Sequence, residues 1–135
     1  MTSVQSQEQE ASGHVIDPAF DWRRVARLFL VSRKLDEIEQ TRFLPEKKVL
    51  YQFSARGHEL GQILLGCLLS DHHDGANGYY RSRPLLLTLG LSAEDALASD
   101  MAKRGGVSDG RDIGVVFNRP SSGAATLLPM AGGVG

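Results

Sequence analysis

Residues 49–69 read VLYQFSARGHELGQILLGCLL, and this stretch decides how the chain folds. Apolar side chains recur in it at the i, i+3, i+4, i+7 and i+8 positions that form one face of a helix. They are Leu60, Ile63, Leu64, Cys67 and Leu68. Ser54 precedes this pattern as a candidate N-cap. Each of the glycines at positions 57, 61 and 66 disfavours a helix by about 1 kcal/mol relative to alanine. The pattern therefore predicts a buried helix whose small residues let another element approach its backbone.

The segment before this stretch is predicted to be a long amphipathic helix over about residues 18–44. Asp17-Pro18 is a typical helix start, and Pro45 follows the expected end. Residues 1–16 are polar and without period, so we expect a flexible N-terminal arm there. The charged residues of the helix are expected on its solvent side: Arg23, Arg24, Arg27, Lys34, Glu37 and Glu39.

The segment after it contains turns and two shorter helices. Residues 70–78 are predicted to be a turn-forming linker, and Pro84 to open a Leu-rich helix that Gly90 closes. Ser92, with Asp95 three positions later, is typical of the next helix start, and Gly105-Gly106 of its end. Residues 107–126 are expected to be mostly loop, with a possible strand at 113–117. The sequence thus predicts the helix-rich N-terminal part of an α/β domain.

Composition excludes several classes of protein. The chain has 135 residues, about one domain, with 15 basic and 16 acidic side chains. Such a balance gives no strong field for nucleic acid or an anionic membrane, so neither is expected as a partner. There is no signal-peptide pattern and no apolar run long enough for a membrane span. The single cysteine, Cys67, excludes an intramolecular disulfide, and we expect a cytoplasmic protein.

The most informative motif is residues 78–84, GYYRSRP, where Arg81 and Arg83 flank Ser82 just before a helix start. An arginine fork suits bidentate recognition of phosphate, and a helix N-terminus adds positive potential. The neighbouring tyrosines add hydroxyl groups and flat apolar faces. The alternative is an ordinary surface loop with solvated arginines.

Other polar motifs have simpler interpretations. Glu59 fits the first turn of a helix through the helix dipole, while His58 is either a general base or a solvated side chain. Residues 71–74, DHHD, could ligate a metal, but consecutive residues rarely converge on one ion, so a polar turn is favoured. Residues 108–112, SDGRD, lack the Walker pattern and are also interpreted as a turn.

The order of these blocks resembles the α-type region of the thiamine-diphosphate-dependent 2-oxo acid dehydrogenases, the E1 components, and the branched-chain (2-oxoisovalerate) branch in particular. The resemblance covers about residues 20–135. After the long helix it rests on VLYQFSARGHELGQILLGCLL, GYYRSRPLLLTLGLSAEDAL (78–97), GRDIGVVFN (110–118) and LLPMAGGVG (127–135). It implies a thiamine-diphosphate-binding fold, with residues 17–135 as a partial domain truncated at the C-terminus.

The resemblance also implies site residues. Tyr80 and Arg81 match the Tyr-Arg pair that contacts the cofactor diphosphate, and Leu128 and Met130 match the turn beside the aminopyrimidine. No catalytic residue and no metal ligand is expected within the chain. The Gly-Asp-Gly…Asn segment that holds Mg²⁺ is absent, and the glutamate that activates the thiazolium comes from a β-type partner region.

The implied activity is oxidative decarboxylation of a branched-chain 2-oxo acid, with acyl transfer to the lipoyl domain of the acyltransferase component. The isolated chain is expected to be inactive. Two alternatives stay open. One is a stand-alone helical interaction module without catalysis, using the Leu60–Leu68 face. The other is a metal hydrolase using His72 and His73.

Overall fold

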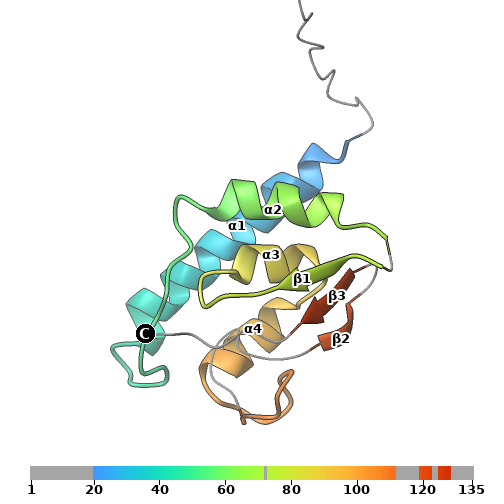
Figure 1. Cartoon of the computed structure of the whole chain (residues 1–135). Coiled ribbons are helices and arrows are strands. Elements are labelled where there is room, and N and C mark those ends of the chain that lie inside the picture. The colour runs from blue at the N-terminus through green and yellow to red at the C-terminus, as the bar shows by residue number, and fades with distance from the viewer. Residues whose placement is uncertain (1–19, 72, 112–118, 123–124, 129–135) are drawn as a thin grey trace, which may run out of the picture.

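The computed structural model describes residues 20–71, 73–111, 119–122 and 125–128. The elements follow in the order shown in Figure 1. The helical ones are α1 (Trp22–Ile38), its π-helical continuation η1 (Glu39–Phe43), α2 (Glu59–Leu68), α3 (Arg83–Thr88) and α4 (Ala93–Asp100). The strands are β1 (Gly75–Asn77), β2 (Arg119–Ser122) and β3 (Ala125–Leu128). The predicted helix-rich character is confirmed, and none of the described helices is long and apolar enough to cross a membrane.

The long first helix is confirmed, with a different start. It begins at Trp22, where the Asp21 carboxylate accepts a hydrogen bond from the Arg24 backbone N–H at 2.9 Å. Such a cap satisfies one of the donors that a helix start leaves unpaired. The predicted start at Asp17-Pro18 lies outside the described residues. The expectation that Glu39 faces solvent is wrong, because its side chain is buried.

The core is centred on α3, which lies between α2 and α4 in Figure 1. All six residues of this short helix are buried. Pro84 occupies its first turn as predicted, and Gly90 follows its end at φ +97°, a backbone conformation that favours glycine. One apolar cluster joins α3 to its neighbours. Its buried members are Leu35, Ala76, Leu85, Leu86, Leu87, Leu89, Leu91 and Ala96.

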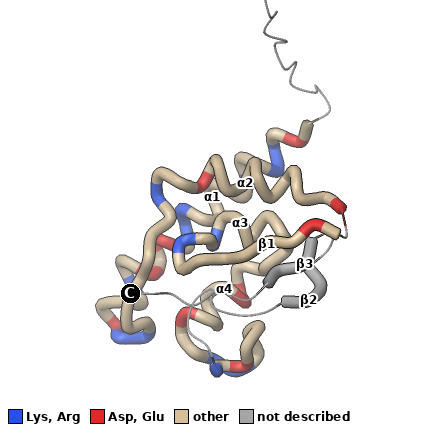
Figure 2. Tube along the Cα trace, viewed as in Figure 1, with Lys and Arg blue, Asp and Glu red and all other residues tan. Residues whose placement is uncertain are grey.

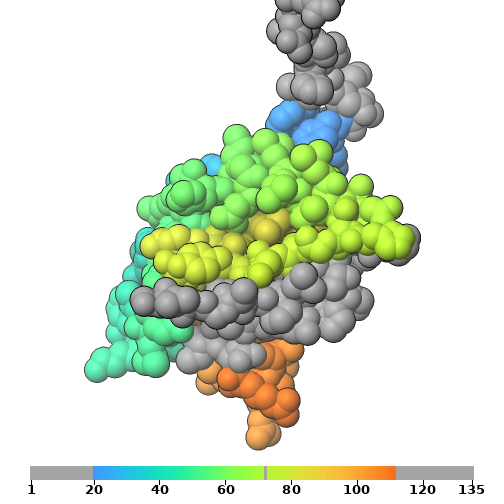
Figure 3. All heavy atoms as spheres, in the orientation of Figure 1, coloured from blue at the N-terminus to red at the C-terminus, as the bar shows by residue number. Residues whose placement is uncertain are grey.

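The second helix is present as predicted, but it is not a buried helix. Ile63 is fully buried, whereas Leu60, Leu65 and Leu68 on the outer side are 49%, 49% and 74% exposed. Side chains of α2 accordingly form part of the molecular surface in Figure 3. The expected close approach is found at Gly66, where an added Cβ would lie 2.7 Å from Thr88.

The predicted N-cap of α2 is also wrong. His58 occupies the cap position without a side-chain hydrogen bond. The Ser54 hydroxyl instead donates to Asp36 Oδ2 at 2.6 Å and accepts from the Arg56 backbone N–H at 3.2 Å. Ser54 therefore belongs to the interior polar contacts of the chain.

The cap of α4 is confirmed, since Ser92 Oγ accepts from the Asp95 backbone N–H at 3.0 Å. The helix ends at Asp100, earlier than the predicted Gly105-Gly106. Residues after it turn through Ala102 at φ +50°.

The strands form one small sheet in the order β1-β3-β2. β1 and β3 are parallel, with Asn77 opposite Leu128, and β2 is antiparallel to β3. The predicted linker at 70–78 and loop at 107–126 are therefore each wrong in part, since both contain strand residues. These strands have three or four residues, too few to show an alternating pattern. The strand predicted at 113–117 lies outside the described residues.

Candidate functional site

The Tyr80–Arg81 segment is a tight turn between β1 and α3. The Tyr79 backbone N–H donates to Ser82 Oγ at 2.8 Å, and the Ser82 backbone N–H donates back to the Tyr79 carbonyl at 2.8 Å. This reciprocal pair fixes the backbone of the two predicted diphosphate contacts. Arg81 is exposed and Tyr80 is half-buried.

Tyr80 belongs to an aromatic cluster formed with Tyr51, Phe53 and Tyr79. Its ring centroid lies 3.8 Å from that of Tyr79 and 4.4 Å from that of Phe53. Tyr51 extends the row, 5.1 Å from Phe53. Tyr51, Phe53 and Tyr79 keep 48%, 38% and 47% of their surface exposed, so the row is a partly open apolar surface.

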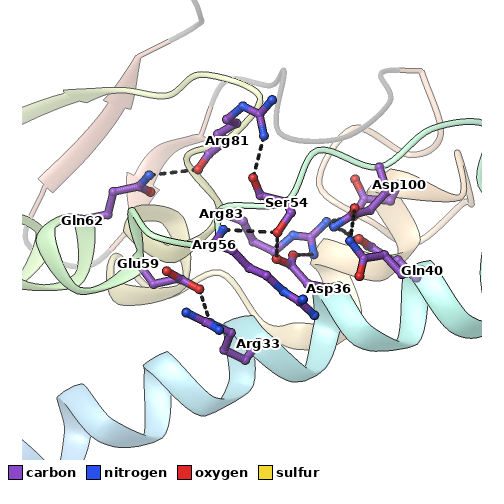
Figure 4. A network of polar contacts seen from close by, with 12 residues as sticks. Arg33, Asp36, Gln40, Ser54, Arg56, Glu59, Gln62, Arg81, Arg83 and Asp100 are labelled. Atoms are coloured by element: carbon purple, nitrogen blue, oxygen red, sulfur yellow. Dashed lines mark hydrogen bonds and ion pairs between the residues drawn. The ribbon is translucent and has the colours of Figure 1, made fainter.

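Arg81 is held against this cluster at several points. Its guanidinium carbon lies 5.4 Å from the Tyr80 ring centroid and 5.8 Å from that of Phe53, within the range of cation–π attraction. Nη1 donates to the Ser54 carbonyl at 2.7 Å. Gln62 of α2 donates to the Arg81 carbonyl at 3.0 Å (Figure 4) and accepts from the Leu85 backbone N–H at 3.3 Å. The arginine is therefore positioned by both α2 and the segment before it, with its outer N–H groups toward solvent.

The two tyrosine hydroxyls are hydrogen-bonded and differ in acidity. The hydrogen bond from Tyr79, and then the hydrogen bond from Arg81 and its charge, lower the pKa of Tyr80. The same Tyr79–Tyr80 hydrogen bond raises the pKa of Tyr79. Because Tyr79 donates its proton to Tyr80, the donors left for an anionic ligand are the Tyr80 hydroxyl and the Arg81 guanidinium.

Arg83 does not form the expected fork with Arg81. Its guanidinium is buried and points inward, where it meets three carboxylates. Figure 4 labels two of their residues, Asp36 and Asp100. Nη2 donates to both Glu39 oxygens at 2.8 Å and to Asp100 Oδ2 at 2.6 Å, while Nη1 donates to Asp36 Oδ1 at 3.2 Å. We call these four residues the ionic cluster. Because Arg83 is occupied there, a ligand at the turn can use Arg81 alone.

The ionic cluster carries more negative than positive groups, and this changes its protonation. Burial, a hydrogen bond to Asp100 and the Asp100 charge outweigh the attraction of Arg83 and raise the pKa of Glu39 to about 8. For Arg83, burial opposes the charge, but Asp100, Glu39 and Asp36 together raise its pKa above the usual range. Glu39 therefore holds a proton at neutral pH and can donate it to Asp100. The ionic cluster thus links η1, α3 and α4 to one another.

Glu59 and His58 differ in environment. Burial would raise the pKa of Glu59, but hydrogen bonds from its own backbone N–H, from Arg33 and from Gly57 outweigh burial and lower it. The Gly57 N–H lies 2.6 Å from Glu59 Oε2, and Arg33 forms an ion pair with Oε1. Glu59 thus ties α2 to α1. His58 is exposed and forms no cap.

The other predicted site residues are placed only in part. Leu128 pairs with Asn77, three positions before Tyr80, so strand pairing brings the two halves of the predicted cofactor site toward one another. Met130 lies outside the described residues. Among residues 71–74, the His73 ring nitrogen contacts Asp71 at 2.9 Å, and His72 is not described. Asp109, at φ +53°, accepts from the Gly105 N–H at 3.0 Å, which fits the predicted turn.

Comparison with known proteins adds no assignment, since no protein-family model and no curated protein matches the chain. Within the described residues, no group of three or more His, Cys, Asp or Glu side chains could hold a metal ion. The three carboxylates that do converge have Arg83 among them.

Sequence reasoning missed three residues of the site: Tyr51, Phe53 and Gln62. The alternation of residues 49–53 places Tyr51 and Phe53 on one side of an extended segment, a signal that could have identified them. Gln62 gives no such signal, because its role depends on the fold.

Proposed function

We propose that this chain is part of a 2-oxo acid dehydrogenase E1 component and supplies one wall of its thiamine diphosphate site. In this role Arg81 and Tyr80 bind the cofactor diphosphate, and the segment around Leu128 and Met130 lies beside the aminopyrimidine. The activity is oxidative decarboxylation of a branched-chain 2-oxo acid followed by acyl transfer to a lipoyl domain. A β-type E1 region completes the site.

The observation that carries this proposal is the setting of Arg81. Its guanidinium is fixed by the Ser54 carbonyl at 2.7 Å and by two aromatic rings, yet the residue is exposed. A guanidinium has several N–H donors, so one bond to a carbonyl leaves others for phosphate oxygens. A pre-positioned arginine loses less conformational entropy on binding than a free one.

Tyr80 and Arg81 are suited to bind the diphosphate group rather than the Mg²⁺ that accompanies it. Tyr80 and Arg81 offer a hydroxyl and a charged donor at adjacent positions, and the Asn77–Leu128 pairing brings the second predicted segment to the same end of β1. Magnesium ligands are expected from sequence outside this chain. Thiamine diphosphate supplies, when bound, the electron sink for decarboxylation. The residues described here bind and orient the cofactor.

A binding titration tests this role. The purified chain is titrated with thiamine diphosphate and, separately, with thiamine, which lacks the diphosphate. We expect weak saturable binding, on the order of millimolar, for thiamine diphosphate only. Arg81→Gln should weaken it about tenfold, because a hydrogen-bonded charge on phosphate is lost.

Arg56→Gln is the matched control, because Arg56 is a nearby exposed arginine on the same segment as Ser54. It should bind as the unaltered chain does. Equal affinity for thiamine and thiamine diphosphate, or equal losses in the two variants, would contradict the assignment.

A second candidate function is a helical interaction module without catalysis. It is favoured by the outer face of α2, where Leu60, Leu65 and Leu68 keep 49%, 49% and 74% of their surface exposed. Adjacent exposed leucines on one helix are typical of a protein-binding face. The titration separates the two functions, since an interaction module has no reason to distinguish thiamine diphosphate from thiamine.

A further inference from the structure

A pocket of about 460 Å³ lies apart from the Tyr80–Arg81 turn, between the end of η1 and the end of α4. This volume falls in the range of small-molecule sites. Basic residues mark both the turn after η1 and the segment after α4 in Figure 2. We call this 460 Å³ pocket the lysine pocket. It is lined by Phe43, Lys47, Lys48, Met101 and Lys103.

The lysine pocket combines an apolar surface with positive charge. Phe43 and Met101 supply a ring and a thioether, and the Lys48 ammonium lies 5.7 Å from the Phe43 ring centroid. Lys48 is paired with Glu46 at 2.5 Å, and this hydrogen bond lowers the pKa of Glu46. Neither Lys47 nor Lys103 forms an ion pair with another described side chain. Two ammonium groups at the pocket therefore remain for an anion.

The backbone at Lys47 is fixed by the cap that ends η1. Lys47 has φ +56°, a left-handed conformation that side chains with a Cβ rarely adopt. The Lys48 N–H donates to the Phe43 carbonyl at 2.8 Å and the Lys47 N–H to the Leu44 carbonyl at 3.0 Å, the hydrogen-bond pair of a Schellman C-cap. The cap thus holds the backbone of both lysines in place at the pocket.

The ionic cluster fixes the two walls of the pocket. Arg83 bonds to Glu39 at the start of η1 and to Asp100 at the end of α4. Phe43 closes η1 four residues after Glu39, and Met101 directly follows Asp100. The separation between the walls is thus set by a buried linkage.

We propose that the lysine pocket binds a small organic anion that carries an aromatic group, with the ring between Phe43 and Met101 and the anionic head at Lys47 and Lys103. This ligand class follows from the pairing of a flat apolar wall with the ammonium groups of Lys47 and Lys103, which form no ion pair within the part of the chain that the structure describes. The proposal is independent of the thiamine diphosphate site.

Phenyl phosphate is the probe, and the chain is labelled at its methionine methyl groups. Of its three methionines, Met101 lines the pocket, and its signal is assigned with Met101→Leu. We expect the Met101 signal to shift saturably with phenyl phosphate, and to respond much less to inorganic phosphate or to phenol at equal concentration. An unshifted Met101 signal, or an equal response to inorganic phosphate, would overturn the proposal.

Lys47→Gly tests the ammonium group without threatening the fold, because glycine adopts a positive φ readily. It should weaken phenyl phosphate binding about fivefold, the upper end for an exposed ion pair. Lys103→Gln should weaken it similarly. Lys34→Gln is the control, since Lys34 is exposed on α1 and bonds to Glu37. Wild-type affinity in Lys47→Gly and Lys103→Gln, or an equal loss in Lys34→Gln, would contradict the site.

Discussion

Among single residues, Glu39 stands out because it shares one buried guanidinium with two other carboxylates. Charges taken out of water are stabilised only where partners compensate them. The positive charge of Arg83 balances one negative charge of the three carboxylates. The proton on Glu39, which is hydrogen-bonded to Asp100, removes a second. Asp36 receives a further hydrogen bond from Ser54. The interior arrangement therefore depends on pH through one carboxyl group.

The stability of the chain should fall as pH rises toward 8. The folded-state pKa of Glu39, about 8, lies above its ordinary value of 4.5, so the folded chain binds more protons between these values. This contribution is fully present below about pH 4.5 and is lost as pH rises through 8, at up to about 1.4 kcal/mol per pH unit.

Denaturant unfolding at a series of pH values measures this effect, with Glu39→Gln as the reference. Glutamine reproduces the protonated carboxyl group and does not titrate, so the stability of the variant should lack this pH dependence. The difference between the two proteins should grow in favour of the variant between about pH 4.5 and 8 and level off above 8. Parallel curves for the two proteins would show that Glu39 does not titrate as described.

Sequence patterns could not place Glu39, Asp36 or Arg83 in the interior, because charged side chains on a helix face water by default. Their partners are far away in sequence, 44 positions for Arg83 with Glu39 and 47 for Arg83 with Asp36. The same distance explains the wrong expectation of an Arg81–Arg83 fork. Arg81 and Arg83 look equivalent in the sequence, and only the packing of α3 places Arg83 in the interior.

Among the elements, α2 packs closely against α3 at Gly66. An added Cβ at Gly66 would lie 2.7 Å from both Cβ and Cγ2 of Thr88, whereas one at Gly61 would meet nothing within 4 Å. Thr88 is held in place, since its hydroxyl donates to the Pro84 carbonyl at 2.8 Å. The two helical glycines therefore differ in what they do for the fold.

Alanine at these two positions should have opposite effects on stability. Gly61→Ala should stabilise by about 0.5–1 kcal/mol through helix propensity alone. Gly66→Ala gains the same helix propensity, but its Cβ pushes α2 away from α3. The free energy of unfolding of Gly66→Ala should therefore lie about 1–3 kcal/mol below that of Gly61→Ala. Thermal or denaturant unfolding measures the difference, and equal stabilities would mean that α2 and α3 do not pack as described.

Elements with local signals could be predicted, and elements without them could not. The structure has the predicted cap of α4, Ser92 with Asp95, and the predicted start and end of α3, Pro84 and Gly90. Each of these signals lies within the length of a single helix. β1 pairs with residues of β3 that lie about 50 positions away, as Asn77 does with Leu128, and such pairing has no local signature. The outer leucines of α2 looked buried because periodicity detects an apolar face and not what covers it.

Across the whole molecule, one chain of polar contacts joins the two candidate sites. Arg81 donates to the Ser54 carbonyl, the Ser54 hydroxyl donates to Asp36, and Asp36 accepts from Arg83 (Figure 4). Arg83 then reaches Asp100, next to the lysine pocket. The turn proposed to bind the cofactor and the lysine pocket are thus distinct surfaces on a common interior support.

The most direct test of the central claim is to map where thiamine diphosphate binds on the ¹⁵N-labelled chain by amide chemical shifts. We expect the changes to concentrate at residues 78–82 and 126–128, and thiamine without its diphosphate to leave these residues largely unchanged. Changes centred on Lys47 and Lys103 would assign the cofactor to the lysine pocket instead. Changes spread without a centre, or their absence at saturating cofactor, would contradict the cofactor role of Tyr80 and Arg81.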